Sequence, residues 1–287
     1  MARQKALPLI GGHVSAAGML SNAITNGEAI GATCIQLFGS SPRQWFVRIP
    51  SPQEAGEFKT RYKNSRIKAV YLHAPYLVNI ASPLVEQRKR SVTTLIGHFR
   101  IAEMIGANGL IFHLGSGKEM VKEEAITEAV NAMKEIIKAV PGESYLIMEN
   151  SAGGGQKLAA IPEELGEMVQ RVNSPRLKVC FDTAHAFEAG IISDYEPETI
   201  KHHIDWWDRA VGLDALVAIH ANDSKTAFNS NNDRHENIGE GFIGMSGFKN
   251  LAKEKRLHSK HWMLEVPGFA GEGPDAKNVT RLRSCFK

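Results

Sequence analysis

The chain has 287 residues, among them 34 Lys and Arg, 31 Asp and Glu and 11 His, for a formal net charge of +3. A hydrophobic content of 43% excludes disordered, collagen-like and coiled-coil proteins, and the longest apolar runs are too short for a membrane span, so no membrane partner is expected. The opening stretch MARQKALPLIGGH lacks the apolar segment of a secretory signal. Three widely spaced cysteines exclude a disulfide framework and a cysteine-based zinc finger, and we expect a cytoplasmic location.

The charge is unevenly distributed along the chain. Residues 1–90 hold 12 basic and 4 acidic side chains, so this third is strongly positive. Such a segment could face the phosphates of a nucleic acid. A solvated lysine-rich surface explains the same imbalance, and the charge alone does not separate the two.

Eight short apolar runs alternate with longer helical patterns. Their starts recur with a mean period of about 36 residues, which predicts parallel strands joined by helical crossovers. We therefore predict a single-domain (β/α)₈ TIM barrel over residues 1–287. The predicted strands are Leu9–His13, Cys34–Phe38, Ile67–His73, Gly109–His113, Tyr145–Asn150, Lys178–Thr183, Ala215–Asp223 and His261–Val266.

Helix signals lie between these runs. Ser51 followed by Pro52 and then by Glu54 predicts a helix that begins with a capping box. Segment 85–106 carries apolar residues at i, i+3, i+4 and i+7, and Gly106 is placed to end that helix; segment 122–140 behaves similarly. We expect the adjacent His202 and His203, on a later helix, to lie at the surface.

Six consecutive predicted strands end in a residue that can ligate a metal. In a TIM barrel these ends meet at the same mouth, and carboxylates and imidazoles gathered in one pocket would repel or stay unsatisfied without a cation. Their chemistry suits zinc or manganese. The residues are His73, His113, Glu149, Asp182, His220 and Glu265.

Three further candidates lie on nearby loops. His185 follows Asp182 by three residues, and Asp233 and His235 form a D-x-H pair whose side chains can point the same way in an extended segment. A lone histidine at such a position is usually a structural residue. Nine candidates together exceed one tetrahedral site and suit three ions that share a bridging carboxylate.

Six motifs carry a close resemblance to a known family. The chain resembles the endonuclease IV family of apurinic/apyrimidinic (AP) endonucleases over nearly its whole length, and the combination of motifs is highly specific. They are G-H-V-S-A-A-G at 12–18, H-A-P-Y-L-V-N at 73–79, E-N-S-A-G at 149–153, D-T-A-H-A-F at 182–187, H-A-N-D-S-K at 220–225 and D-R-H-E-N-I-G-E-G at 233–241.

The resemblance implies three Zn²⁺ ions, one of which Mn²⁺ or Fe²⁺ could replace. It assigns His73, His113 and Glu149 to the first ion. It assigns Glu149, Asp182, His220 and Glu265 to the second, with Glu149 as the bridging catalytic carboxylate, and His185, Asp233 and His235 to the third. The positive charge of three such ions exceeds the negative charge of the four carboxylates, so the site would attract an anionic phosphodiester.

The implied activity is metal-assisted cleavage of double-stranded DNA 5′ to an abasic site, which leaves a 3′-hydroxyl, together with removal of groups that block 3′ ends. By resemblance, Arg43, Gln44, Tyr76 and Leu77 would insert at the lesion. A proline-shaped turn with an aromatic residue packed over the barrel mouth is the alternative for these loops. A monomer is expected, because an open mouth must accept duplex DNA.

Two other functions stay open at this point. A two-metal sugar isomerase or epimerase on the related barrel would need neither the D-x-H pair nor arginine and tyrosine at the rim. A DNA-binding module without turnover would not require nine intact ligands. The chain also departs from the family at Asn231, where arginine is usual, so we expect weaker contact with DNA there.

Overall fold

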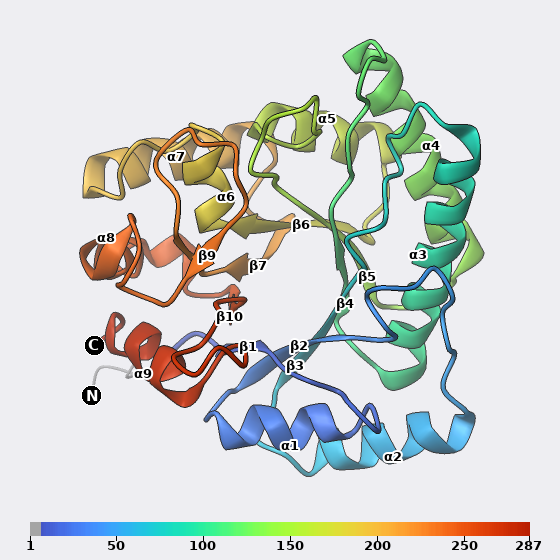
Figure 1. Cartoon of the computed structure of the whole chain (residues 1–287), viewed down its shortest axis with the longest axis horizontal. Helices are drawn as coiled ribbons and strands as arrows, with labels where there is room; N and C mark the ends of the chain where they lie inside the picture. The colour runs from blue at the N-terminus through green and yellow to red at the C-terminus, as the bar shows by residue number, and fades with distance from the viewer. Residues whose placement is uncertain (1–6) are drawn as a thin grey trace.

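Eight parallel strands close into a barrel in the computed structural model, which describes residues 7–287 (Figure 1). The predicted TIM barrel is confirmed, and neighbours around the barrel follow the order β1-β10-β7-β6-β5-β4-β3-β2. The barrel strands are β1 (Ile10–His13), β2 (Cys34–Phe38), β3 (Ala69–His73), β4 (Gly109–Phe112), β5 (Tyr145–Glu149), β6 (Leu177–Asp182), β7 (Leu216–His220) and β10 (His261–Leu264).

Helices surround the barrel and fill most of the crossovers, as Figure 1 shows. Among residues 7–287, none of them combines the length and the apolar character that crossing a membrane requires. They are α1 (Asn22–Ala29), α2 (Pro52–Lys63), α3 (Val85–Ile105), α4 (Lys122–Ala139), α5 (Pro162–Val172), α6 (Thr183–Glu188), α7 (Pro197–Ala210), α8 (Gly244–Leu251), the short 3₁₀ helix η1 (Lys255–Leu257) and α9 (Ala276–Ser284).

The predicted strands are found with ends that differ by up to two residues, except for one. The predicted strand Ala215–Asp223 is divided: β7 ends at His220, and a separate two-residue strand β8 (Asp223–Ser224) pairs antiparallel with β9 (His235–Glu236). The apolar pattern runs on through Ala221, which is fully buried, so the sequence does not show where the barrel strand ends. This hairpin brings the D-x-H segment back to the barrel mouth.

Local helix signals behave as the sequence predicts. The Ser51 hydroxyl accepts a hydrogen bond from the Glu54 amide at 3.2 Å, and the Glu54 carboxylate accepts one from the Ser51 amide at 2.8 Å, which completes the capping box. Gly106 ends α3 in the left-handed conformation, with φ of 70°. The expectation for His203 is wrong: its ring is buried and accepts a hydrogen bond from the Trp207 indole, because this face of α7 packs inward.

A layer of apolar side chains forms the interior of the barrel beneath the mouth. Seven barrel strands each contribute to this layer, and the residue two positions later on the same strand, or just past its end, is polar. Because side chains alternate between the two faces of a strand, both members of each pair point inward. The pairs are Cys34 and Gln36, Tyr71 and His73, Ile111 and His113, Ile147 and Glu149, Cys180 and Asp182, Ala218 and His220, and Met263 and Glu265.

Candidate metal centre

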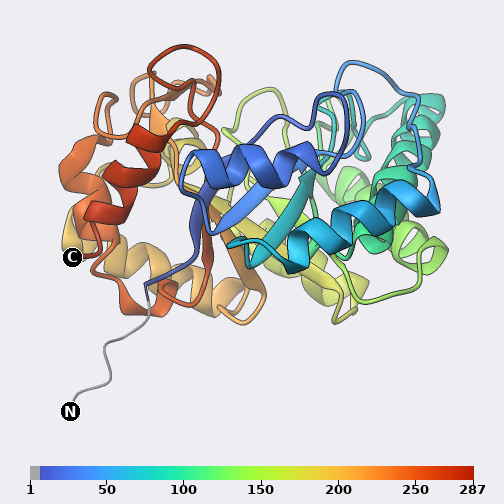
Figure 2. The ribbon, with the colours of Figure 1, turned by 90° about the horizontal axis from the view of Figure 1, so that it is seen from below.

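The polar layer lies at the carboxyl ends of the barrel strands. Figure 2 views the barrel from the side, and the long loops that follow several strands gather at one end of it. All nine candidate ligands lie in this region, six from strand ends and three from α6 and the β8–β9 hairpin. Eight of them form three adjoining groups whose donor atoms lie within 4.8 Å of one another, and the ninth, Asp233, lies beside the third group. The groups are His73, His113 and Glu149; Glu149, Asp182, His220 and Glu265; and Asp182, His185 and His235.

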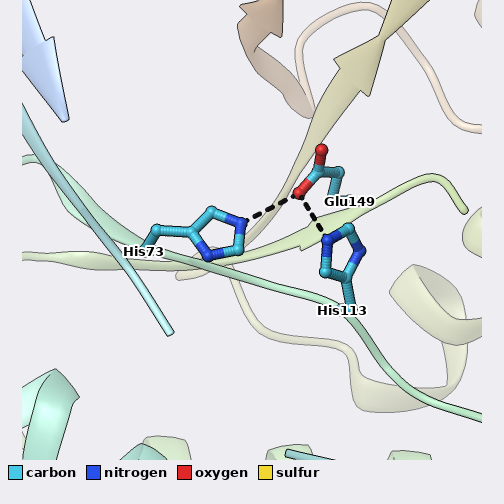
Figure 3. A group of neighbouring side chains, drawn as sticks. All are labelled: His73, His113 and Glu149. Carbon is cyan, nitrogen blue, oxygen red and sulfur yellow. Dashed lines mark hydrogen bonds and ion pairs between the residues drawn. The ribbon is translucent and has the colours of Figure 1, made fainter. Parts of the chain in front are cut away.

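Glu149 lies at the centre, fully buried, with its two oxygens facing different histidines. One oxygen, Oε2, is 3.1 Å from Nε2 of His73 and 3.5 Å from Nε2 of His113 (Figure 3). The other, Oε1, is 2.7 Å from Nδ1 of His220 and 3.5 Å from Nδ1 of His185. A carboxylate in this position can serve two neighbouring cations at once.

The second group surrounds His220, whose ring is fully buried. Its Nδ1 lies 3.3 Å from Oε2 of Glu265 and 3.9 Å from Oδ2 of Asp182. Glu265 lies just past the end of β10, and Asp182 is the last residue of β6. With Glu149, these residues offer three carboxylates and one imidazole around one point.

The third group combines α6 with the hairpin. Asp233 spans two imidazoles, with Oδ2 at 3.3 Å from Nε2 of His185 and Oδ1 at 3.5 Å from Nε2 of His235. Asp182 also approaches, at 3.8 Å from Nε2 of His235. The structure therefore brings Asp233 to the two histidines that the resemblance pairs with it, and it adds Asp182 as a second carboxylate nearby.

Hydrogen bonds behind the ligands fix which nitrogen of each ring faces the centre. Nδ1 of His73 donates to the carbonyl of Ala74 at 2.8 Å, and Nδ1 of His185 donates to the carbonyl of Asn150 at 2.8 Å. Each ring therefore presents a lone pair at Nε2. His220 has the opposite orientation, because its Nε2 donates to the side-chain oxygen of Gln36 at 2.8 Å and leaves Nδ1 for the centre.

The electrostatics are those of a site built for a cation. Burial alone would raise the pKa of Glu149, but the neighbouring imidazoles of His220 and His113 outweigh it and hold that pKa well below its usual range. Burial would lower the pKa of His185, yet Asp182 and Asp233 raise it well above its usual value. The raised pKa favours a proton on the His185 imidazole when no metal is bound, and a metal ion must displace that proton.

The residues fit a divalent metal. Nε2 of His185 and Nε2 of His235 are buried and have no hydrogen-bond partner within the part of the chain that the structure describes. Buried polar atoms are rarely left unpaired, and these two face the carboxylate of Asp233 at distances longer than a good hydrogen bond. His, Asp and Glu donors without cysteine are a set that divalent ions take in catalytic sites.

Sequence reasoning missed the residues that support the ligands. Gln36 is fully buried, and its amide donates to Oε1 of Glu265 at 2.5 Å while its oxygen accepts from His220. Asn222 donates to Oδ2 of Asp182 at 2.6 Å. The signal for Gln36 is in the sequence: it follows Cys34 by two residues, as each metal-ligand candidate on a strand follows an apolar residue of that strand.

The proposed DNA-contacting residues lie on two loops at the mouth. Arg43 and Gln44 are exposed, and Tyr76 is 66% exposed, so the alternative of an aromatic side chain packed over the mouth does not hold for Tyr76. Leu77 is partly buried beside it. An open cleft of about 880 Å³ lies between the loops after β1, β2 and β10, and Glu265 forms part of its wall.

Comparison with known proteins agrees with this geometry. The profile of the family described as "Xylose isomerase-like TIM barrel" matches residues 24–285. A "Probable endonuclease 4" from Halothermothrix orenii is 34% identical over 275 residues, which is 96% of this chain and 99% of the relative. The structure of endonuclease IV from Thermus thermophilus superposes with a TM-score of 0.84 and 33% identity, over 97% of this chain and 98% of that one.

The fold and the mouth of His, Asp and Glu residues thus define a xylose isomerase-like TIM barrel with a candidate metal centre. A D-tagatose 3-epimerase-like protein shares this fold with a TM-score of 0.68 at 18% identity, which shows the fold alone. The near full-length relatives are more specific. The chain belongs to the endonuclease IV family of AP endonucleases.

Proposed function

We propose that this chain is a zinc-dependent AP endonuclease of DNA base excision repair, acting as a monomer on double-stranded DNA. It hydrolyses the phosphodiester 5′ to an abasic site, leaves a 3′-hydroxyl and removes groups that block 3′ ends. The observation that carries this proposal is the position of Glu149 between two groups of histidines, because a shared carboxylate couples adjacent cations into one cluster.

The proposed cofactor is three Zn²⁺ ions, one replaceable by Mn²⁺ or Fe²⁺. His73, His113 and Glu149 would hold the first, and His185, Asp233 and His235 the third. Glu149, Asp182, His220 and Glu265 would hold the second. When bound, closely spaced divalent ions supply a nucleophile at neutral pH and stabilise the attacking and leaving oxygens of an in-line displacement.

The chain's own residues prepare the site before DNA arrives. Gln36 holds His220 and Glu265 in fixed orientations, so neither has to reorganise when a metal enters. The apolar layer below, which includes Ile147 and Met263, closes the barrel against water from beneath. A phosphodiester therefore meets fixed ligands at the open end, where electrostatic stabilisation is most effective.

Arg43, Gln44, Tyr76 and Leu77 would enter the duplex at the lesion. An abasic nucleotide lacks stacking and pairing, so extruding it costs less than flipping an intact nucleotide. The exposed ring of Tyr76 can fill the gap, and the cleft beside Glu265 offers room for an extruded sugar next to the cluster. Asn231 is exposed on the β8–β9 loop, where a short amide side chain provides less reach to phosphate than arginine.

A duplex that carries one tetrahydrofuran abasic analogue tests the proposal. We expect zinc-supported nicking immediately 5′ to the analogue, a 3′-hydroxyl that a polymerase extends, and loss of cutting after chelation. The undamaged duplex of the same sequence is the control and should stay intact. Binding without nicking would favour a DNA-binding module, and ketose–aldose exchange without nicking would favour a sugar isomerase.

A further inference from the structure

A buried carboxylate outside the nine candidate ligands lies beneath the third group. Glu188 is fully buried and is the last residue of α6, the short helix that carries His185. It follows His185 by three positions, so both lie on one face of the helix. The first turn of α6 is fixed in turn, because Oδ1 of Asp182 accepts the His185 amide at 2.8 Å.

Glu188 binds the segment that leads to the D-x-H pair. Its Oε1 accepts hydrogen bonds from the hydroxyls of Ser224 and Thr226 and from the backbone amide of Arg234, at 2.8, 3.3 and 3.3 Å. Its backbone carbonyl accepts the Asn231 amide at 2.9 Å. One residue therefore contacts both ends and the middle of the loop between β8 and β9.

Other contacts also hold this loop: the Asn229 amide donates to the carbonyl of Phe187 at 3.1 Å, and the rings of Phe187 and Phe228 lie 5.6 Å apart. The β8–β9 pairing spans only two residue pairs, and residues 227–232 are exposed. The single hydroxyl proton of Thr226 is shared between Oε1 of Glu188 at 3.3 Å and the carbonyl of Asn232 at 3.0 Å, so this contact reaches the residue just before Asp233. The contacts with Phe187 hold the loop at residues 228 and 229, whereas the Glu188 side chain holds the amide of Arg234, the residue next to Asp233.

Burying this carboxylate is costly, and the cost argues for a positional role. Oε2 of Glu188 has no hydrogen-bond partner in the described residues, and burial raises the pKa of the carboxyl. Such a group contributes little to stability by itself. What it does supply is a rigid connection between two elements that both carry ligands.

We propose that Glu188 is a positioning residue that sets the spacing between His185 on α6 and the Asp233–His235 segment, and thereby the affinity of the third metal site. This inference rests on the three-ion function proposed above. It assigns to Glu188 a role at one ion only, because none of its side-chain hydrogen bonds reaches a ligand of the first or the second group.

The test compares zinc content, measured by elemental analysis after equilibration in a zinc buffer, for wild type, Glu188→Ala, Glu188→Gln and Asp233→Ala. We expect three ions in the wild type, and a 10- to 100-fold weaker affinity for one ion in Glu188→Ala, the effect typical of losing a supporting contact. Glu188→Gln keeps an oxygen acceptor and should restore that ion. The double variant Glu188→Ala/Asp233→Ala should lose no ion beyond the one that Asp233→Ala loses, because coupled residues are non-additive.

Glu103→Ala provides a matched control. Glu103 is a partly buried carboxylate that pairs with Arg176 at 2.7 Å, and it also accepts the amide of Ser144, which lies just before β5 at the opposite end of the barrel. The Glu103→Ala variant should therefore keep all three ions. For Glu188→Ala we also expect a lower kcat with an unchanged KM for the abasic duplex, and recovery of kcat as the free zinc concentration rises.

Three ions bound with wild-type affinity in Glu188→Ala would overturn the inference, and so would loss of a second ion in the double variant. If Glu188→Ala does not fold, Thr226→Val removes only one hydroxyl on the loop side and should still weaken the same ion; unchanged affinity there also refutes the role. A wild-type chain that holds fewer than three ions would instead refute the proposed three-ion function, and this inference with it.

Discussion

Glu149→Ala is the most demanding test of the proposed cluster. The two carboxylate oxygens of Glu149 lie 3.1 Å from Nε2 of His73 and 2.7 Å from Nδ1 of His220, so one substitution removes a donor from two groups of ligands. The first group is then reduced to two histidines. Because losing a mere supporting contact weakens metal binding about 10- to 100-fold, we expect loss of a direct donor to exceed 100-fold at each site.

The effect on turnover follows from those losses. One preorganised stabilising group is worth about 10²–10³ in kcat, and two displaced ions should together cost roughly 10⁴ or more. At about 1.36 kcal/mol per tenfold change, that is at least about 5.4 kcal/mol in the activation free energy.

The assay is single-turnover nicking of the abasic duplex, with metal content measured on the same samples. Glu149→Gln serves as the companion variant, because it keeps the shape and one oxygen but loses the charge. We expect both variants to retain about one ion, with Glu149→Ala the slower. Three retained ions, or turnover within tenfold of wild type, would refute the bridging assignment.

Four further predictions concern other parts of the chain. Tyr76→Ala should weaken binding of the abasic duplex about 5- to 150-fold, the range for one lost stacking contact of ~1–3 kcal/mol, with unchanged metal content; loss of metal would show that the loop is misplaced. Gln36→Ala should lower zinc affinity about 10- to 100-fold without unfolding, as followed by competition with a chelating dye. In the metal-free chain the pKa values of His185 and His220 are raised, so protonation of these rings stabilises the folded state. This stabilisation is complete below the unfolded pKa of ~6.5 and is lost as the pH rises through the folded pKa values. The difference in melting temperature between metal-loaded and metal-free protein should therefore widen from pH 6 to pH 9, and curves of melting temperature against pH that stay parallel would contradict the shifts. Ser51→Ala should reduce the unfolding free energy by about 1 kcal/mol in a denaturant titration and leave nicking unchanged.

The sequence by itself determines the barrel and most of its mouth. Apolar runs at a regular spacing specify parallel strands, and the last inward-facing position of each strand is readable because side chains alternate. His73, Glu149 and His220 could therefore be placed at the mouth from the printed letters alone. The family motifs add the loop residues, since no periodicity points to them.

Only the tertiary structure decides how these residues combine. The β8–β9 hairpin divides a run that looks continuous, and its antiparallel pairing places Asp233 against His185, which lies far from it along the chain. The same folding buries His203 and makes Glu188 the link between helix and hairpin. Such contacts depend on where two distant segments meet in space, and local propensity and spacing carry no information about that distance.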